Sequence, residues 1–328
     1  MNSTNATARY TGVLYLLLLS VAAPALYAQG TSRGVQFFES GDWAGAKAEF
    51  SVAVQRNDRD ARSHYYLGRL AMLEDDADTA AEHFERAVTL DQSVSDYHLW
   101  YGNAIGQQGS RVSMLKQPFL ARRMKSELER AVELDARNID ARDGLVDFYS
   151  MAPGAMGGST DKAREQAQAL AQVDAMRGHL AFARLAVNAK DTPAVEREMN
   201  AAIAAAPDNR RGYSALALWY EREKKWPQAF ATLDPYIKRY PDDPYGPYGI
   251  GRIAAASGQQ LERGEKGIRA FLAKPPKDAG PLVLSRAYQR LGQVLEHQGK
   301  RAEARSAFEQ AVKIDPRNEE AKKALTAR

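Results

Sequence analysis

Apolar residues recur along this chain at the spacing of paired amphipathic helices. Towards the C-terminal end, Tyr288, Leu291 and Leu295 fall three or four positions apart, which puts them on one face of a helix. Ala304 and Phe308 begin a second run with the same spacing, after the polar stretch EHQGKR. Residues three and four apart are neighbours on a helix surface, so each run can bury one stripe. The pattern therefore predicts two consecutive amphipathic helices joined by a short polar turn.

The same arrangement returns at a fixed interval of 34 residues. Gly68 recurs one interval later as Gly102, and three apolar positions of the N-terminal part behave in the same way. These three are Ala46, Phe50 and Ala53, which recur as Ala80, Phe84 and Ala87. A period between about 20 and 50 residues indicates an array of stacked repeats. The 328 residues are therefore predicted to form one long repeat domain.

The repeated residues resemble the tetratricopeptide repeat, a unit of about 34 residues with an aromatic residue, Leu-Gly, Tyr, Ala, Phe and a closing Pro. The fullest unit contains Tyr288, Leu291, Gly292, Leu295, Ala304, Phe308, Ala311 and Pro316. A similar unit contains Tyr213, Leu216, Ala217, Tyr220, Ala229, Leu233, Tyr236 and Pro241. This resemblance implies an all-α fold, namely an α-solenoid of about eight helix-turn-helix units in a right-handed superhelix.

Placed on that pattern, the mature chain divides into eight units and a cap. We expect the solenoid over residues 29–318, with units at about 27–60, 61–94, 95–138, 139–175, 176–209, 210–243, 244–284 and 285–318. The polar segment 319–328 is expected to form a helix that caps the open end. Three units are overlong, with extra residues around 107–126, 153–160 and 275–284. Insertions in repeat arrays map to loops on one face, which is often the binding face.

The N-terminal residues have the pattern of a secretory signal peptide. Arg9 is the only charged side chain before an apolar run from Val13 to Ala23, and small residues follow up to Ala28. We expect a signal peptide over residues 1–28, with cleavage after about Ala28. The run is shorter than the ~20 residues that span a bilayer, so no transmembrane segment is expected in the mature chain. The sequence thus predicts an exported protein, which we place in the bacterial periplasm.

Composition and histidine placement argue against metal, thiol and nucleic-acid chemistry. The 45 basic and 41 acidic residues leave a net charge of +4, too small an excess to indicate a nucleic-acid partner. The chain has no cysteine, which excludes disulfides, thiol nucleophiles and thiolate metal sites. His64, His98 and His179 occupy the aromatic position of their repeats, and no His-Glu-x-x-His sequence is present. We predict that these histidines pack in the core and that the chain holds no metal and no cofactor.

The stretch FYSMAPGAMGGSTDKA, residues 148–163, has the glycine content of a phosphate-binding loop. A Walker loop requires lysine directly after its last glycine, whereas Gly158 is followed by Ser159. The chain also has no Gly-x-Ser-x-Gly nucleophile sequence, so we predict no catalytic residue. The stretch is predicted to be a lengthened turn in which Ser159 or Thr160 caps the following helix.

In the family that the chain resembles, the first helix of each unit lines a concave surface that holds an extended peptide or a partner helix. On that template the candidate partner-binding residues are Arg62, Tyr65, Arg69, Asn103, Arg177, Arg184, Arg211, Tyr245, Tyr248, Arg252 and Arg286. Arginine and tyrosine are enriched at binding hot spots. Asp140, Asp143 and Asp147 interrupt this basic wall. The alternation predicts a ligand of mixed charge.

Three functions are compatible with these residues. The leading prediction is a non-enzymatic scaffold or adapter in the cell envelope that binds a protein or peptide partner in the concave groove. The first alternative is a protein that binds a glycan or another envelope polymer by stacking it on Tyr65, Tyr245 and Tyr248. The second alternative is an enzyme that uses the glycine-rich loop 153–162.

Overall fold

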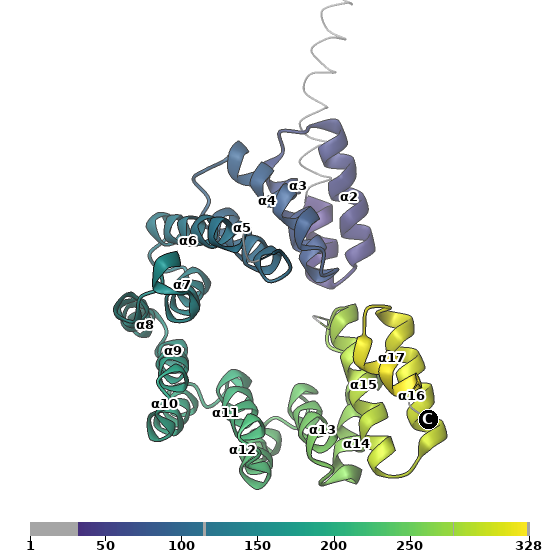
Figure 1. Cartoon of the computed structure of the whole chain (residues 1–328). Coiled ribbons are helices and arrows are strands. Elements are labelled where there is room, and N and C mark those ends of the chain that lie inside the picture. The colour runs from purple at the N-terminus through teal and green to yellow at the C-terminus, as the bar shows by residue number, and fades with distance from the viewer. Residues whose placement is uncertain (1–31, 114–115, 278, 327–328) are drawn as a thin grey trace, which may run out of the picture.

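A computed structural model describes residues 32–113, 116–277 and 279–326 as a succession of helices (Figure 1). A helical segment over residues 32–40 comes first. The elements that follow are α2 (Trp43–Arg56), α3 (Ala61–Leu73), α4 (Ala77–Leu90), α5 (Ser95–Gly109), α6 (Gln117–Leu134), α7 (Ile139–Met151), the 3-10 turn η1 (Gly154–Met156), α8 (Thr160–Val173), α9 (Ala175–Asn188), α10 (Thr192–Ala205), α11 (Arg210–Arg222), α12 (Trp226–Arg239), α13 (Tyr245–Ser257), α14 (Leu261–Ala273), α15 (Pro281–His297), α16 (Arg301–Ile314) and α17 (Glu319–Thr326). The described residues contain no β-strand, so the predicted all-α fold is confirmed. The predicted signal peptide, residues 1–28, lies outside the described residues.

Consecutive helices pack closely where a glycine of one helix faces a phenylalanine of the next. A Cβ atom on Gly68 of α3 would lie 2.7 Å from the ring of Phe84 in α4. A Cβ atom on Gly292 of α15 would lie 2.6 Å from the ring of Phe308 in α16. Both rings are buried, and burying a phenylalanine contributes about 1.5–3 kcal/mol. The glycine and phenylalanine positions of the repeat thus form a single contact, because only glycine leaves room for the ring.

The extra residues of the three overlong units take different structural forms. In the first case they extend the helices, since α5 has 15 residues and α6 has 18. In the second case they form η1 and the glycine-rich turn between α7 and α8. In the third case they form the segment 274–280 and lengthen α15 to 17 residues. No helix among the described residues is long and apolar enough to cross a membrane.

The two ends of the solenoid meet, so that the helices form a closed ring (Figure 1). Arg317, in the turn between α16 and α17, donates from Nη2 to the carbonyl oxygen of Glu74 at 3.0 Å. Its Nη1 lies 3.4 Å from Oδ2 of Asp75, just after the end of α3. A second contact brings Gly41 against the segment after α14, where a Cβ atom would lie 3.0 Å from the carbonyl oxygen of Lys277. The ring is therefore closed by contacts between its first and last helix pairs.

We expect the substitution Arg317→Glu to open the ring. The Arg317 and Asp75 side chains are 57% and 29% exposed, and an exposed ion pair contributes only about 0.2–1 kcal/mol. Reversing the charge replaces attraction by repulsion of similar size, which should raise the open population several-fold. Small-angle X-ray scattering would then show a larger radius of gyration than for the unaltered chain. Arg305→Glu is the matched control because Arg305 pairs only within α16, with Glu309; identical scattering from all three proteins would contradict closure by Arg317.

Candidate binding groove

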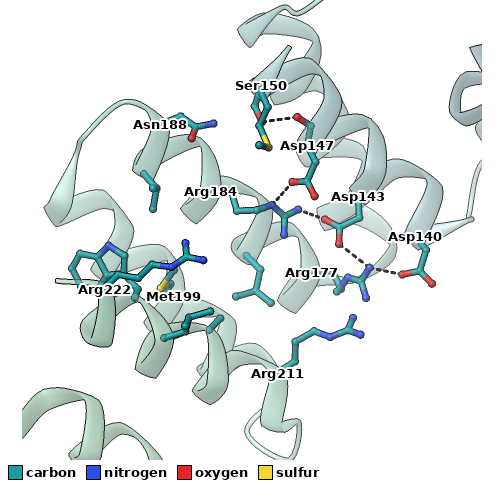
Figure 2. Close-up of a pocket in the computed structure, with 16 residues that line it drawn as sticks. Asp140, Asp143, Asp147, Ser150, Arg177, Arg184, Asn188, Met199, Arg211 and Arg222 are labelled. Atoms are coloured by element: carbon teal, nitrogen blue, oxygen red, sulfur yellow. Dashed lines mark hydrogen bonds and ion pairs between the residues drawn. The ribbon is translucent and has the colours of Figure 1, made fainter. Parts of the chain in front are cut away.

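The inner faces of α7, α9 and α11 surround a groove with a volume of about 580 Å³ (Figure 2). The three helices are the first members of successive helix pairs, and α9 packs against both α7 and α11. One residue of α10, Met199, also reaches the groove. The groove is thus built by neighbouring repeats, as expected for the concave surface of a stacked array.

A network of ion pairs joins α7 to α9 along one side of the groove. Asp143 lies at its centre: Oδ2 accepts a hydrogen bond from Nη2 of Arg177 at 2.8 Å, and Oδ1 accepts one from Arg184. Arg177 also donates to Asp140, and Nε of Arg184 lies 2.9 Å from Oδ1 of Asp147. The three aspartates are therefore paired with arginines of the next unit.

Burial strengthens the coupling within this network. Arg177 is only 8% exposed. Burial raises the pKa of Asp147, the guanidinium of Arg184 lowers it, and the neighbouring carboxylate of Asp143 raises it again. The acidic patch is thus a structural partner of two predicted contact residues rather than a free acidic surface.

Apolar side chains form the floor of the groove. Leu180, Met199 and Trp219 line it and are each 7% exposed. At its edge, Met151 is 77% exposed and Val187 is 39% exposed. Large apolar side chains with such exposure mark surfaces that can bury a partner's apolar residue.

Two arginines of α11 border the groove without an ion pair. Arg211 and Arg222 are both exposed and line the groove. Within the part of the chain that the structure describes, neither guanidinium forms a salt bridge, and Figure 2 shows both extending from α11. After the pairing of Arg177 and Arg184 with aspartates, the positive charge available in the groove comes from these two residues.

The groove contains three of the predicted contact residues: Arg177, Arg184 and Arg211. The others lie on other helices of the ring, namely Arg62, Tyr65 and Arg69 on α3, Asn103 on α5, Tyr245, Tyr248 and Arg252 on α13, and Arg286 on α15. The sequence reasoning missed Leu218, Trp219 and Arg222. The repeat interval could have found two of them, because 34 residues separate Arg184 from Leu218 and Asn188 from Arg222.

The aromatic residues predicted to stack on a glycan are engaged in packing. Tyr65 is 8% exposed, because its ring packs against Tyr66 and Tyr97 at centroid distances of 5.2 and 5.1 Å. The rings of Tyr245 and Tyr248 pack on Phe271 at 5.3 and 4.5 Å. Tyr65 therefore offers no free ring face to a sugar, and the polymer-binding alternative gains no support.

The histidines at the aromatic repeat positions combine packing with polar contacts. His64 and His98 are 8% and 5% exposed. Nδ1 of His64 lies 3.0 Å from Nδ1 of His83, and burial, together with the charges of His64 and Lys47, lowers the pKa of His83 to about 4. Nδ1 of His98 lies 2.7 Å from Oε2 of Glu127. Among the described residues no group of three metal-ligating side chains occurs.

The glycine-rich loop uses its amides internally. Gly157, Gly158 and Ser159 donate their N–H groups to the carbonyl oxygens of Gly154, Pro153 and Tyr149, at 3.0, 3.1 and 2.8 Å. Oγ of Ser159 accepts a hydrogen bond from the amide of Lys162 at 3.3 Å, so the predicted cap of α8 is confirmed for Ser159. A phosphate cradle requires free amides, so this loop has the bonding of a turn.

Paired helices in a closed array with a concave groove define this protein as an α-solenoid repeat protein. The chain belongs to the tetratricopeptide repeat family, whose sequence descriptions match residues 32–104, 215–243 and 285–318. The predicted resemblance is thereby confirmed. A search of curated protein sequences found no match to the chain.

Solved structures with a similar fold are also tetratricopeptide repeat proteins. A thermophilic protein of Thermus thermophilus is 18% identical with a TM-score of 0.48, and the match covers 58% of this chain and 98% of that chain. A protein from Parabacteroides merdae is 14% identical with a TM-score of 0.47, over 81% of this chain and 97% of that one. YrrB, described as having an unusual peptide-binding site, is 19% identical with a TM-score of 0.41, over 56% and 87%.

Proposed function

We propose that the chain is a non-catalytic scaffold that binds a segment of a partner protein in the groove between α7, α9 and α11. The observation that carries this proposal is the combination of an apolar floor with two unpaired arginines, Arg211 and Arg222. Repeat solenoids use extended concave surfaces of this kind for binding. A buried apolar anchor beside a charge-assisted hydrogen bond is the usual composition of a binding hot spot.

The chemistry of the groove indicates the composition of the bound segment. A large apolar side chain would rest on Leu180 and Trp219, with Met151 closing over its edge. An acidic residue beside it would bind Arg211 or Arg222, because a guanidinium pairs with a carboxylate through two parallel hydrogen bonds. We therefore infer a segment in which an acidic residue adjoins an aromatic or long aliphatic one.

The place of action follows from the N-terminal sequence. The apolar run from Val13 to Ala23 and the small residues up to Ala28 support export by a cleaved signal peptide. We propose an adapter role in the bacterial periplasm on this basis. Mass spectrometry of the exported chain tests it, since the mature protein should begin at Gln29.

Selection from a random peptide library displayed on phage tests the groove. We expect enriched peptides to contain the acidic-plus-apolar pair, and their affinity for the double substitution Arg211→Glu with Arg222→Glu to fall at least about tenfold, because two charge-assisted contacts are lost. Fluorescence anisotropy of the synthesised peptides measures the affinity.

The matched control carries Arg164→Glu on α8 and Arg197→Glu on α10, both exposed and outside the groove. It has the same change in net charge, so it should keep the affinity of the unaltered chain. Peptides that bind both double variants equally well would remove the groove from consideration.

A further inference from the structure

Arginines outnumber acidic residues on the three first helices nearest the C-terminal end of the ring. α13 packs against both α11 and α15, so these helices form one continuous wall. Their only acidic residues are Glu221 and Glu296, whereas their arginines are Arg210, Arg211, Arg222, Arg252, Arg286 and Arg290. Such an excess, without counter-charges on the same wall, is unfavourable unless an external anion offsets it.

Tyr248 marks the centre of an arginine cluster, which we define as Arg222, Arg252, Arg286 and Arg290. Arg252 follows Tyr248 by one helical turn, and Arg286 and Arg290 are one turn apart on α15. Burial raises the pKa of Tyr248, and the guanidinium groups of Arg290, Arg252 and Arg286 are near enough to lower it in turn. The Tyr248 hydroxyl makes no hydrogen bond to any residue that the structure describes, so it is available as a donor.

One carboxylate faces the cluster. Oε2 of Glu221 lies 3.4 Å from Nη2 of Arg252, and the two side chains are 13% and 22% exposed. Burial lowers the pKa of Arg252; Glu221 opposes this effect, and the positive charges of Arg290 and Arg222 add to it. Arg252 is therefore a half-buried cation surrounded by more positive than negative charge.

The remaining arginines of the cluster have no carboxylate partner. Nη1 of Arg290 donates to the neutral side chain of Gln293 at 3.0 Å. Over the described ranges of the chain, Arg222 and Arg286 form no salt bridge. Four arginines against one glutamate leave an excess of about three positive charges at neutral pH.

Arg286 and Arg290 also border a recess of about 470 Å³ where the ends of the ring meet. The acidic side chains of that recess are engaged by other groups: Asp75 by Arg111 and Arg317, Asp315 by Arg317, Glu319 by Lys322, and Glu320 by Gln289. They do not neutralise the cluster, and the recess provides room for a small anion beside it.

We propose that the arginine cluster and the Tyr248 hydroxyl form a binding site for a phosphoryl group. A phosphoryl group carries about −1.5 to −2 charges at neutral pH and three acceptor oxygens. Planar guanidinium groups bind such oxygens in pairs, and several of them around one group suit a dianion better than a single carboxylate. Of the groove residues, only Arg222 belongs to the cluster, so the site does not depend on the proposed peptide-binding function.

Isothermal titration calorimetry of the full mature chain with inorganic pyrophosphate, at fixed ionic strength, tests the proposal. We expect saturable binding that weakens at least about tenfold in Arg290→Gln, because a charge-assisted hydrogen bond is lost. Arg252→Lys should weaken binding less, since it keeps the charge beside Glu221. The removal of an exposed arginine elsewhere, in Arg164→Gln, should leave binding unchanged.

Three results would overturn the proposal. These are the absence of saturable binding, equal affinity in Arg290→Gln and the unaltered chain, and equal affinity for citrate, which would point to carboxylates instead of phosphoryl groups. Circular dichroism of each variant verifies that it is folded. The Arg211→Glu and Arg222→Glu peptide experiment uses a different ligand, so failure of one proposal is distinguishable from failure of the other.

Discussion

The substitution Asp143→Asn is expected to destabilise the protein by about 3 kcal/mol. Removing one partner from a buried ion pair costs about 3–5 kcal/mol, because it leaves an uncompensated charge in a poorly solvated place. The Asp143 side chain is 20% exposed and that of Arg177 is 9% exposed. Asparagine keeps the size but removes the charge that Arg177 and Arg184 share. The loss should fall at the lower end of the range, since Asp140 and Asp147 still offset the two arginines.

Urea unfolding followed by circular dichroism measures this loss. Because repeat arrays can unfold in parts, hydrogen exchange gives the local answer, and protection should fall in α7 and α9 while α15 is unaffected. Asp140→Asn is the matched control: Asp140 contacts the same arginine but is 66% exposed, so its removal should cost no more than about 1 kcal/mol. Equal losses in both variants would show that burial does not govern the network.

The helix pairs could be predicted from the sequence because their determinants are local. Gly68 and Phe84 lie 16 residues apart and touch within one pair, and the same contact recurs at Gly292 and Phe308. A contact of this kind is repeated at every unit with the same spacing. Its period is therefore visible in the sequence alone.

The composition of the groove could be predicted only in part. The template identified Arg177 and Arg184 as inner residues, but not that both are neutralised by Asp140, Asp143 and Asp147. That pairing depends on the angle between successive units, which the repeat pattern does not specify. The available positive charge consequently lies one unit further along, on α11.

Ring closure could not be predicted for a related reason. Arg317 and Asp75 are 242 residues apart and meet only because small rotations between units accumulate over the whole array. No local pattern in the sequence carries that sum. The same accumulation brings Arg286 and Arg290 to the border of the recess at the seam.

The substitution Gly158→Ala is expected to destabilise the turn before α8 by about 3 kcal/mol, the upper end of the range for overpacking. A Cβ atom at this position would lie 1.8 Å from the carbonyl oxygen of Ala152, which is backbone and cannot rotate away. Relief of the clash must disturb the bond from the amide of Ser159 to Tyr149, and with it the cap of α8. Gly154→Ala is the control from the same loop, because nothing lies within 4 Å of its Cβ position, and it should change stability by less than about 0.5 kcal/mol.

Urea unfolding and hydrogen exchange at the amide of Lys162, which donates to the Ser159 cap, distinguish the two variants. Faster exchange in Gly158→Ala alone would mean that glycine is required here for close approach of two backbone segments. Equal exchange and stability in both variants would contradict this explanation. The glycines would then have to serve something other than the turn, and the enzyme that uses loop 153–162 would again need to be considered.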